Sequence, residues 1–334
     1  TLAVSAVEGD ALGVGSAVTL ASGALLTMNA DGSYSYDPNG QFDSLRAGET
    51  TTDSFDYTVA DSQGATQTAT ATVTINGVNN GPIVGDDTGE TGENNVLTVA
   101  AADGVLANDV DPDAGDTLSV VIVEGADVDP VTGAQVALAS GAVVTMFADG
   151  SYSYDPGTAF DYVAEGDTAT DSFTYTAGDS ADGTSAGTVT ITITGSNDGP
   201  VAVADTLVVD SLEFTGIEPE YGLLSNDVDP DVGDWLEVTD VNGNAMTADG
   251  FVELLLPSGA YLYVYSDGTV EFDPAGVYET LEMGQTVTET VTYTVGDGFG
   301  ATSQSTLDVV IAKNNVSTLE LDGSNGFAIV GADM

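Results

Sequence analysis

The sequence contains no cysteine and no histidine, and only two of its 334 residues are basic, Arg46 and Lys313. A chain without cysteine has no disulfide to stabilise it. A chain without histidine cannot form a Ser-His-Asp triad, a Cys-His pair or a histidine-bearing zinc site. No run approaches the roughly 18 apolar residues that cross a membrane as a helix. These absences exclude catalytic and zinc sites that depend on histidine, and they leave the stabilising role of disulfides to some other interaction.

Acidic side chains dominate the charge, because 54 Asp and Glu residues give a formal net charge of −52 at pH 7. Such a chain repels nucleic acid, and it repels itself on folding unless divalent ions or concentrated salt offset the charge. Disorder is not predicted, since 42% of the residues are hydrophobic and Phe and Tyr recur in register. The composition predicts a folded protein that depends on cations. A halophilic surface of merely solvated acids is the alternative.

A repeat of 118 residues runs through the chain. The string NDVDPDAGD at 108–116 returns as NDVDPDVGD at 226–234, and two sets of aspartates follow the same spacing: Asp31, Asp149 and Asp267, and Asp61, Asp179 and Asp297. A fixed long period indicates a few copies of one domain. We predict an incomplete first domain at 1–80, complete domains at 81–198 and 199–315, and a different module at 316–334.

The first copy starts within the repeat, because TLAVSAVEG at Thr1 matches TLSVVIVEG at Thr117. Residues equivalent to 83–116 are therefore absent from it. Two explanations stay open: the sequence is a fragment of a larger protein, or another chain supplies the missing strands.

Strand patterns dominate each copy. In the first, Phe55, Tyr57 and Val59 alternate with polar residues, and Ala69, Ala71, Val73 and Ile75 do so after a turn. Period-two alternation broken by turn residues is typical of a half-buried hairpin. With many Thr, Val and Tyr and no long helical periodicity, the sequence predicts an all-β protein of seven-strand-like sandwiches. The aromatic residues are expected in the core. Boundaries are predicted at VNNGP (78–82) and SNDGP (196–200), where Asn, Gly and Pro end a strand.

The repeated acidic loop is the candidate metal site. Its D-x-D-x-D-x-G-D pattern places carboxylates at alternate positions, and calcium prefers six to eight hard oxygen ligands. The candidate ligands are Asp109, Asp111, Asp113 and Asp116 in the second copy and Asp227, Asp229, Asp231 and Asp234 in the third. The loop is not an EF-hand, because its glycine comes one place late and Val120 or Val238 stands where a bidentate glutamate belongs. A solvated acidic turn is the alternative.

The strings GVLANDVDPDAGD, ADGSYSYDP, TTDSFDYTVAD and the NNGP or NDGP junctions resemble the VCBS-type, cadherin-like repeats of large bacterial RTX-type surface adhesins. The resemblance covers residues 1 to about 313. It implies a linear array of tandem Ig-like or cadherin-like β-sandwiches that is secreted, binds calcium, and serves adhesion, biofilm or cell-surface architecture. The tail LDGSNGFAIVGADM resembles the opening of an FG-GAP, integrin-α-like repeat.

The resemblance also implies ligands around the junctions. The cadherin linker is similar to 76–82 and 194–200, which places Asn79, Asn80, Asn197 and Asp198 at ligand-like positions. An acid from the preceding domain corresponds to Glu49 and Asp167, whereas the third copy has Gln285. Asp87-Thr88-Gly89 has the letters of an aspartic-protease motif, but no second copy provides the partner carboxylate. Asp87 and its equivalent Asp205 are instead included among the candidate metal ligands.

These observations favour a non-enzymatic, extracellular, calcium-stiffened spacer or stalk of a bacterial surface adhesin or matrix protein. Its partners would be calcium, neighbouring repeats, and other copies of itself or a surface receptor or glycan, without nucleic acid or membrane insertion. Two alternatives remain: a subunit of an extracellular filament or surface layer completed by strand exchange, and the accessory stalk of a large secreted enzyme.

Overall fold

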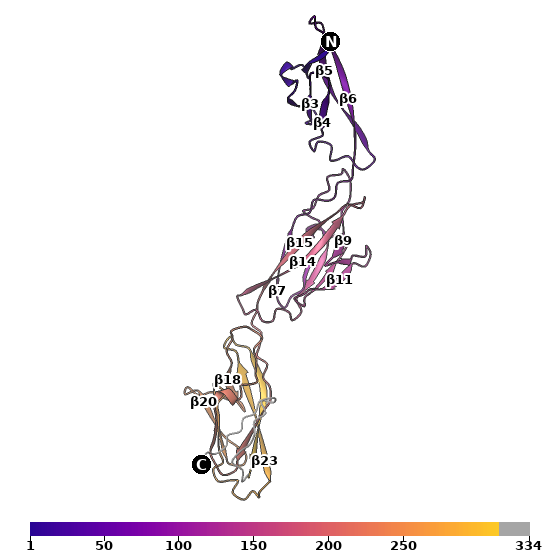
Figure 1. The fold of residues 1–334 in the computed structure, drawn as a ribbon. Helices are drawn as coiled ribbons and strands as arrows, with labels where there is room; N and C mark the ends of the chain where they lie inside the picture. The colour runs from indigo at the N-terminus through magenta and orange to yellow at the C-terminus, as the bar shows by residue number, and fades with distance from the viewer. Residues whose placement is uncertain (314–334) are drawn as a thin grey trace. The chain divides into compact units, whose positions relative to one another are not determined.

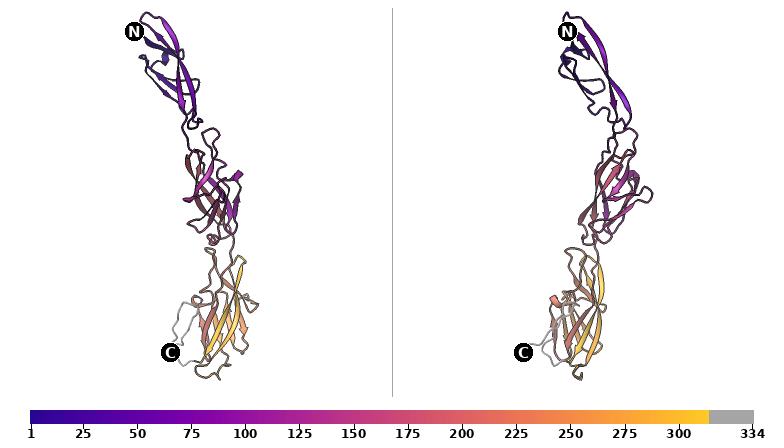
Figure 2. Two further views of the ribbon diagram at one scale, coloured as in Figure 1. Left: turned by 90° about the vertical axis from the view of Figure 1, so that its right-hand side faces the viewer. Right: turned by 45° about the vertical axis from the view of Figure 1, so that its right-hand side comes forward.

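The structure is a computed structural model, and it describes residues 1–313. Within that range the chain consists of strands, loops and three short 3-10 helices, η1 (Ala11–Gly13), η2 (Ala101–Asp103) and η3 (Pro219–Tyr221) (Figure 1). No helix in this range is long and apolar enough to cross a membrane. The predicted all-β fold of tandem sandwiches is confirmed, and Figure 2 shows from two further sides that each repeat is built of strands joined by loops.

The described chain forms two compact units. The first comprises residues 1–90, 96–155 and 170–191, and the second comprises residues 91–95, 156–169 and 192–313. The second sequence repeat therefore contributes to both units. The predicted domain boundaries remain predictions, and the module expected at 316–334 lies outside the described residues.

Each repeat is built around one long antiparallel hairpin with strands of 11 residues. These are β5 (Thr50–Ala60) with β6 (Thr66–Asn76), β14 (Thr168–Gly178) with β15 (Thr184–Thr194), and β23 (Thr286–Gly296) with β24 (Thr302–Ala312). Alternate residues of β23 point inward, so Val291, Tyr293 and Val295 are buried. The hairpin predicted from alternation in the first copy is confirmed by the pairing of Phe55 with Ala71.

The third repeat packs a five-stranded sheet on a four-stranded one. The first sheet has the order β16-β24-β23-β18-β19 and the second β17-β22-β21-β20. Their remaining strands are β16 (Asp205–Asp210), β17 (Thr215–Ile217), β18 (Glu237–Val241), β19 (Asn244–Ala245), β20 (Phe251–Leu255), β21 (Tyr261–Tyr265) and β22 (Val270–Asp273). Leu262, Phe272 and Val309 are fully buried in one core cluster. The first strand of the repeat pairs in parallel with its last, from Asp205 opposite Leu307 onward.

The second repeat has the same plan, with sheets β10-β9-β14-β15-β7 and β11-β12-β13-β8. Its remaining strands are β7 (Asp87–Gly92), β8 (Leu97–Val99), β9 (Ser119–Val123), β10 (Ala126–Asp127), β11 (Ala134–Ala137), β12 (Val143–Met146) and β13 (Tyr152–Asp155). The aromatic residues Tyr154, Phe173 and Tyr175 are buried, as the sequence predicts.

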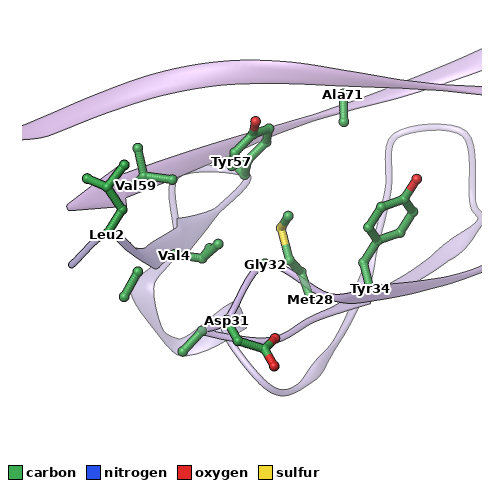
Figure 3. A pocket seen from close by; sticks show the side chains of 11 residues that line it. Leu2, Val4, Met28, Asp31, Gly32, Tyr34, Tyr57, Val59 and Ala71 are labelled. Atoms are coloured by element: carbon green, nitrogen blue, oxygen red, sulfur yellow. The ribbon is translucent and has the colours of Figure 1, made fainter. Parts of the chain in front are cut away.

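The first repeat has only three strands in each sheet, β1-β5-β6 and β2-β3-β4, where β1 is Ala3–Val7, β2 Ala17–Thr19, β3 Leu25–Met28 and β4 Tyr34–Asp37. The described part of this repeat holds no counterparts of β7 and β8, and an open groove lies beside β4 and β5 (Figure 3). Val4, Met28, Tyr34 and Tyr57 line it. Tyr34 is 51% exposed, whereas its equivalent Tyr152, which pairs with Val99 of β8, is 3% exposed.

Candidate metal centres

The first acidic site consists of Asp111, Asp113 and Asp116, which lie in the loop before β9. One carboxylate oxygen from each lies within 4.8 Å of the others. The loop turns tightly because Asp111 Oδ1 accepts a hydrogen bond from Asp113 N at 2.8 Å and because Gly115 adopts φ 81°. Burial, followed by the charges of Asp179, Asp113 and Asp116, raises the pKa of Asp111. The geometry concentrates negative charge where the preceding junction meets the loop.

The junction residues hold this loop in place. Asn80 N donates to Asp113 Oδ2 at 2.8 Å, and Asn79 Nδ2 donates to Asp179 Oδ2 at 2.9 Å. Burial opposes ionisation of Asp179, but the hydrogen bonds from Asn79, Ala181 N and Gly183 N outweigh it and lower the pKa of Asp179. The first repeat also reaches the site, since Asn80 Nδ2 donates to the carbonyl oxygen of Asp43 at 2.9 Å. Asp179 is therefore a fourth carboxylate beside the triad.

Arg46 supplies the only described ion pair. Its Nε lies 3.1 Å from Asp116 Oδ1, but the two atoms do not form a hydrogen bond. One of the two basic residues of a chain with net charge −52 thus stands at the first acidic site. The equivalent position in the second repeat is Ala164, so the next site has no such guanidinium.

The second acidic site repeats the geometry with Asp229, Asp231 and Asp234, again within 4.8 Å of one another. Asp198 N donates to Asp231 Oδ2 at 2.8 Å, and Asn197 Nδ2 donates to Asp297 Oδ2 at 2.8 Å. Burial raises the pKa of both Asp229 and Asp234, and neighbouring carboxylates, Asp297 among them, raise it further.

Two further acidic residues, Glu93 and Asp198, lie beside the second triad. Glu93 is only 1% exposed, and its Oε1 accepts hydrogen bonds from the backbone and hydroxyl of Ser196, both at 2.6 Å. Burial raises its pKa, and the charges of Asp198 and Asp231 add to the effect. Burial and the charges of Asp161 and Asp231 likewise raise the pKa of Asp198. The second site is therefore more acidic than the first and lacks its arginine.

Buried carboxylate oxygens without a hydrogen-bond donor test whether calcium fits these sites. The buried oxygens that lack a partner at the two sites are Asp111 Oδ2 and Asn79 Oδ1 at the first, and Glu93 Oε2, Asp198 Oδ2, Asp229 Oδ2 and Asp231 Oδ1 at the second. Buried polar groups are normally paired, and an unpaired buried charge is costly. Oxygen atoms of carboxylates and amides are the ligands that calcium takes. The residues present fit a calcium ion at both sites.

Asp109 and Asp227 lie apart from the triads, with Asp87 and Asp205. Asp109 Oδ1 accepts from Gly85 N at 2.9 Å, and the hydroxyl of Tyr175 lies 3.1 Å from Asp87 Oδ2 and 3.2 Å from Asp109 Oδ2. Burial raises the pKa of Asp87 to about 6. These aspartates form an inner cluster in each complete repeat, although the sequence groups Asp109 with Asp111.

Glu49 and Asp167 are exposed and lie outside both triads. Glu49 Oε2 accepts from Arg46 N at 3.2 Å within its own turn. Their role as ligands stays a prediction.

The structure instead brings Asp179, Asp297 and Glu93 to the sites. The sequence showed Asp179 and Asp297 only as repeat markers, and their 118-residue spacing was the available signal. Glu93 carried no such signal, because the residue 118 positions later is Ser211 and the acid is therefore not repeated.

These features define a class: tandem β-sandwich repeats with an acidic site at each junction. The chain belongs to the bacterial cadherin-like domain family, whose model matches residues 1–77, 79–195 and 197–313. Cadherin-like domains bind calcium and neighbouring repeats or copies, and tandem arrays of them are stalk- or adhesion-type modules.

Several solved structures that are similar to the chain are cadherin or protocadherin ectodomains. The chain shares 14% identity with mouse cadherin-23 EC22-24, covering 94% of this chain and 86% of that one with a TM-score of 0.44. It shares 13% identity with mouse clustered protocadherin PcdhgC3 EC1-3, covering 89% of this chain and 88% of that one with a TM-score of 0.36. With the human desmocollin-1 ectodomain it shares 13% identity, covering 86% of this chain and 51% of that one with a TM-score of 0.38. The chain thus spans about half the length of the desmocollin-1 ectodomain. No curated protein matches it.

Proposed function

We propose that this chain is a non-enzymatic, extracellular, calcium-stiffened stalk segment of a large bacterial surface adhesin or matrix protein. One observation carries the proposal. Two successive junctions each face an aspartate triad whose buried oxygens include some without a hydrogen-bond donor. A divalent ion at these oxygens neutralises the charge that burial makes costly.

The proposed action is mechanical. At the first site, Ala114 N donates to the carbonyl oxygen of Ser44 at 3.2 Å, and at the second, Val232 N donates to that of Tyr162 at 3.2 Å. The acidic loop of each complete repeat therefore contacts the end of the repeat before it. An ion bound by loop and junction together cross-links the two, and this restricts their relative motion. Extracellular modules need only a Kd of about 10⁻⁴ to 10⁻³ M, because calcium outside the cell is abundant.

A melting series tests the proposal. We expect millimolar calcium to raise the Tm well above its value in chelator, because bound ions stabilise the state that binds them. Magnesium should rescue poorly, since it demands near-ideal octahedral geometry and keeps its waters. Sodium chloride at matched ionic strength is the control. Equal rescue by sodium chloride would show that the acids are only a halophilic surface.

Strand exchange is a second candidate, favoured by the open groove of the first repeat. Edge strands β4 and β6 of that repeat lack the partners that β13 and β15 have in β8 and β7. A donor segment with the sequence of residues 83–99, supplied by another copy, would cover Tyr34 and pair with both edges. Adding a synthetic peptide of that sequence should raise the Tm of the first repeat. A scrambled peptide is the control, and an unchanged Tm rejects this candidate.

A further inference from the structure

An inner oxygen cluster in the third repeat is separate from both acidic sites. We define the inner cage as Asp205, Asp227, the hydroxyl of Tyr293, the carbonyl oxygen of Val203 and the amide of Asn226. Asp205 opens β16, Tyr293 lies on β23, and the other residues come from the loops beside them. Asp205 and Asp227 are 5% and 8% exposed.

Hydrogens are too few for the oxygens of this cage. The Tyr293 hydroxyl lies 2.7 Å from the Val203 carbonyl oxygen and 2.7 Å from Asp205 Oδ2, yet it has a single hydrogen to donate. Val203 N satisfies Asp227 Oδ1 at 2.7 Å. Asp205 Oδ1 and Asp227 Oδ2 remain buried without any partner. The Asn226 side chain lies near Asp205, but neither of its polar atoms makes a hydrogen bond.

Each of these two buried carboxylates leaves one oxygen without a hydrogen-bond donor, and a single bound cation would satisfy both oxygens. No lysine or arginine is available there, because Lys313 donates to the Glu279 carbonyl oxygen and Arg46 belongs to the first acidic site. Two carboxylates balance one divalent cation, and the carbonyl, amide and phenolic oxygens are further hard ligands of the kind calcium accepts.

We propose that the inner cage of the third repeat binds its own Ca²⁺ ion, which stabilises the interior of that repeat independently of the junction. The second repeat offers a matched comparison. There Tyr175, Asp87 and Asp109 occupy the same places, but no carboxylate oxygen among them is buried without a partner. The proposal is therefore confined to the third repeat. It shares only the choice of ion with the proposed stalk function.

Calcium counting on the whole chain tests the cage. Bound Ca²⁺ is measured by equilibrium dialysis for the unaltered protein, for Asp205→Asn, for the junction variant Asp229→Asn/Asp231→Asn, and for Asp267→Asn as an exposed control. We expect Asp205→Asn to bind about one ion fewer per chain. Asp267→Asn should bind as many ions as the unaltered protein. If Asp205→Asn also binds as many, the inner site does not exist.

The same set separates this inference from the stalk proposal. A junction variant that keeps its full ion count overturns the junction sites and leaves the cage intact. The Tm of the variants gives a second readout. In chelator, the Asp205 carboxylate is a buried charge without a counter-ion, and Asp205→Asn removes that charge. Asp205→Asn should melt no lower than the unaltered protein in chelator, yet gain less from calcium.

Tyr293→Phe provides a test that does not depend on the folding of Asp205→Asn, because it keeps both carboxylates and the aromatic ring. We expect this variant to lose stability mainly in calcium, because it removes one oxygen ligand of the ion. A purely structural hydroxyl would instead cost the same Tm with calcium and with chelator, and that result overturns the proposal.

Discussion

At the scale of single residues, the two acidic sites are built from the same triad but differ in charge. The first has Arg46 against Asp116, and the second has Glu93 and Asp198 among its acids. A guanidinium is permanently positive, so Arg46 neutralises part of the carboxylate charge that only a bound ion could neutralise at the second site. The two sites should therefore depend on calcium to different degrees.

Replacing Arg46 by glutamine should make the first site more dependent on calcium. In chelator, Asp116 loses its counter-charge, and we expect a loss of about 1 kcal/mol or less, because the arginine is partly exposed. In calcium, the ion replaces the missing charge and the loss should shrink. Lys313→Gln is the control, since it removes the same charge from a side chain that donates to the carbonyl oxygen of Glu279 and not to a carboxylate of the triad. Equal losses in both conditions would contradict this expectation.

Glu93→Gln should weaken calcium binding at the second site. The amide oxygen can still accept the hydrogen bonds from Ser196, so the local structure should survive while one charged ligand is lost. We expect a lower calcium-induced rise in Tm and an unchanged or higher Tm in chelator. Glu124→Gln is the matched control, because exposed Glu124 also accepts from a backbone amide, that of Thr174. A calcium response equal to that of the unaltered chain would exclude Glu93 as a ligand.

At the scale of structural elements, close approaches of backbone fix where the loops cross. A Cβ on Gly222, at the end of η3, would stand 2.2 Å from the carbonyl oxygen of Gly268, and Gly104 meets Gly150 in the same way at 2.3 Å. Only glycine allows this contact, which sets the loop that leads to the acidic site. The turn chemistry thus serves the site as well as the fold.

Gly222→Ala should destabilise the third repeat by about 1–3 kcal/mol, because the backbone must move to admit the methyl group. Gly216→Ala is the control: its Cβ would meet nothing closer than the Glu271 side chain at 3.7 Å. Urea unfolding followed by the fluorescence of Trp235 measures both variants. Equal midpoints for the two would show that the loop yields without cost.

At the scale of the whole molecule, repulsion among 54 acidic residues opposes any ordered arrangement of repeats unless cations intervene. Ions bound at the junctions would restrict the motion of one repeat relative to the next. An ion bound in the inner cage would stabilise the third repeat alone. Distance measurements can separate these effects from melting.

Calcium should narrow the distribution of distances between the first and third repeats. The chain has no cysteine, so single cysteines at exposed Gln63 and Asp249 can carry two spin labels without interference. We expect a broad distribution in chelator and a narrow one in calcium, and Asp111→Asn/Asp113→Asn should restore part of the breadth. Identical distributions in both conditions would reject the stiffening role.

The sequence by itself determined the repeat, the long hairpins and the aspartates of the triads. These features rest on local rules: alternation sets the faces of a strand, Asp-Gly sets a turn, and clustered carboxylates draw cations. Only the tertiary structure separated Asp109 from Asp111, because its neighbour in space is Tyr175, 66 residues later. Glu93 and Arg46 occur in one copy each, so no periodicity could reveal them. Their roles arise from folding, which brings the buried Glu93, just after β7, and the partly exposed Arg46 beside loops that are distant in sequence.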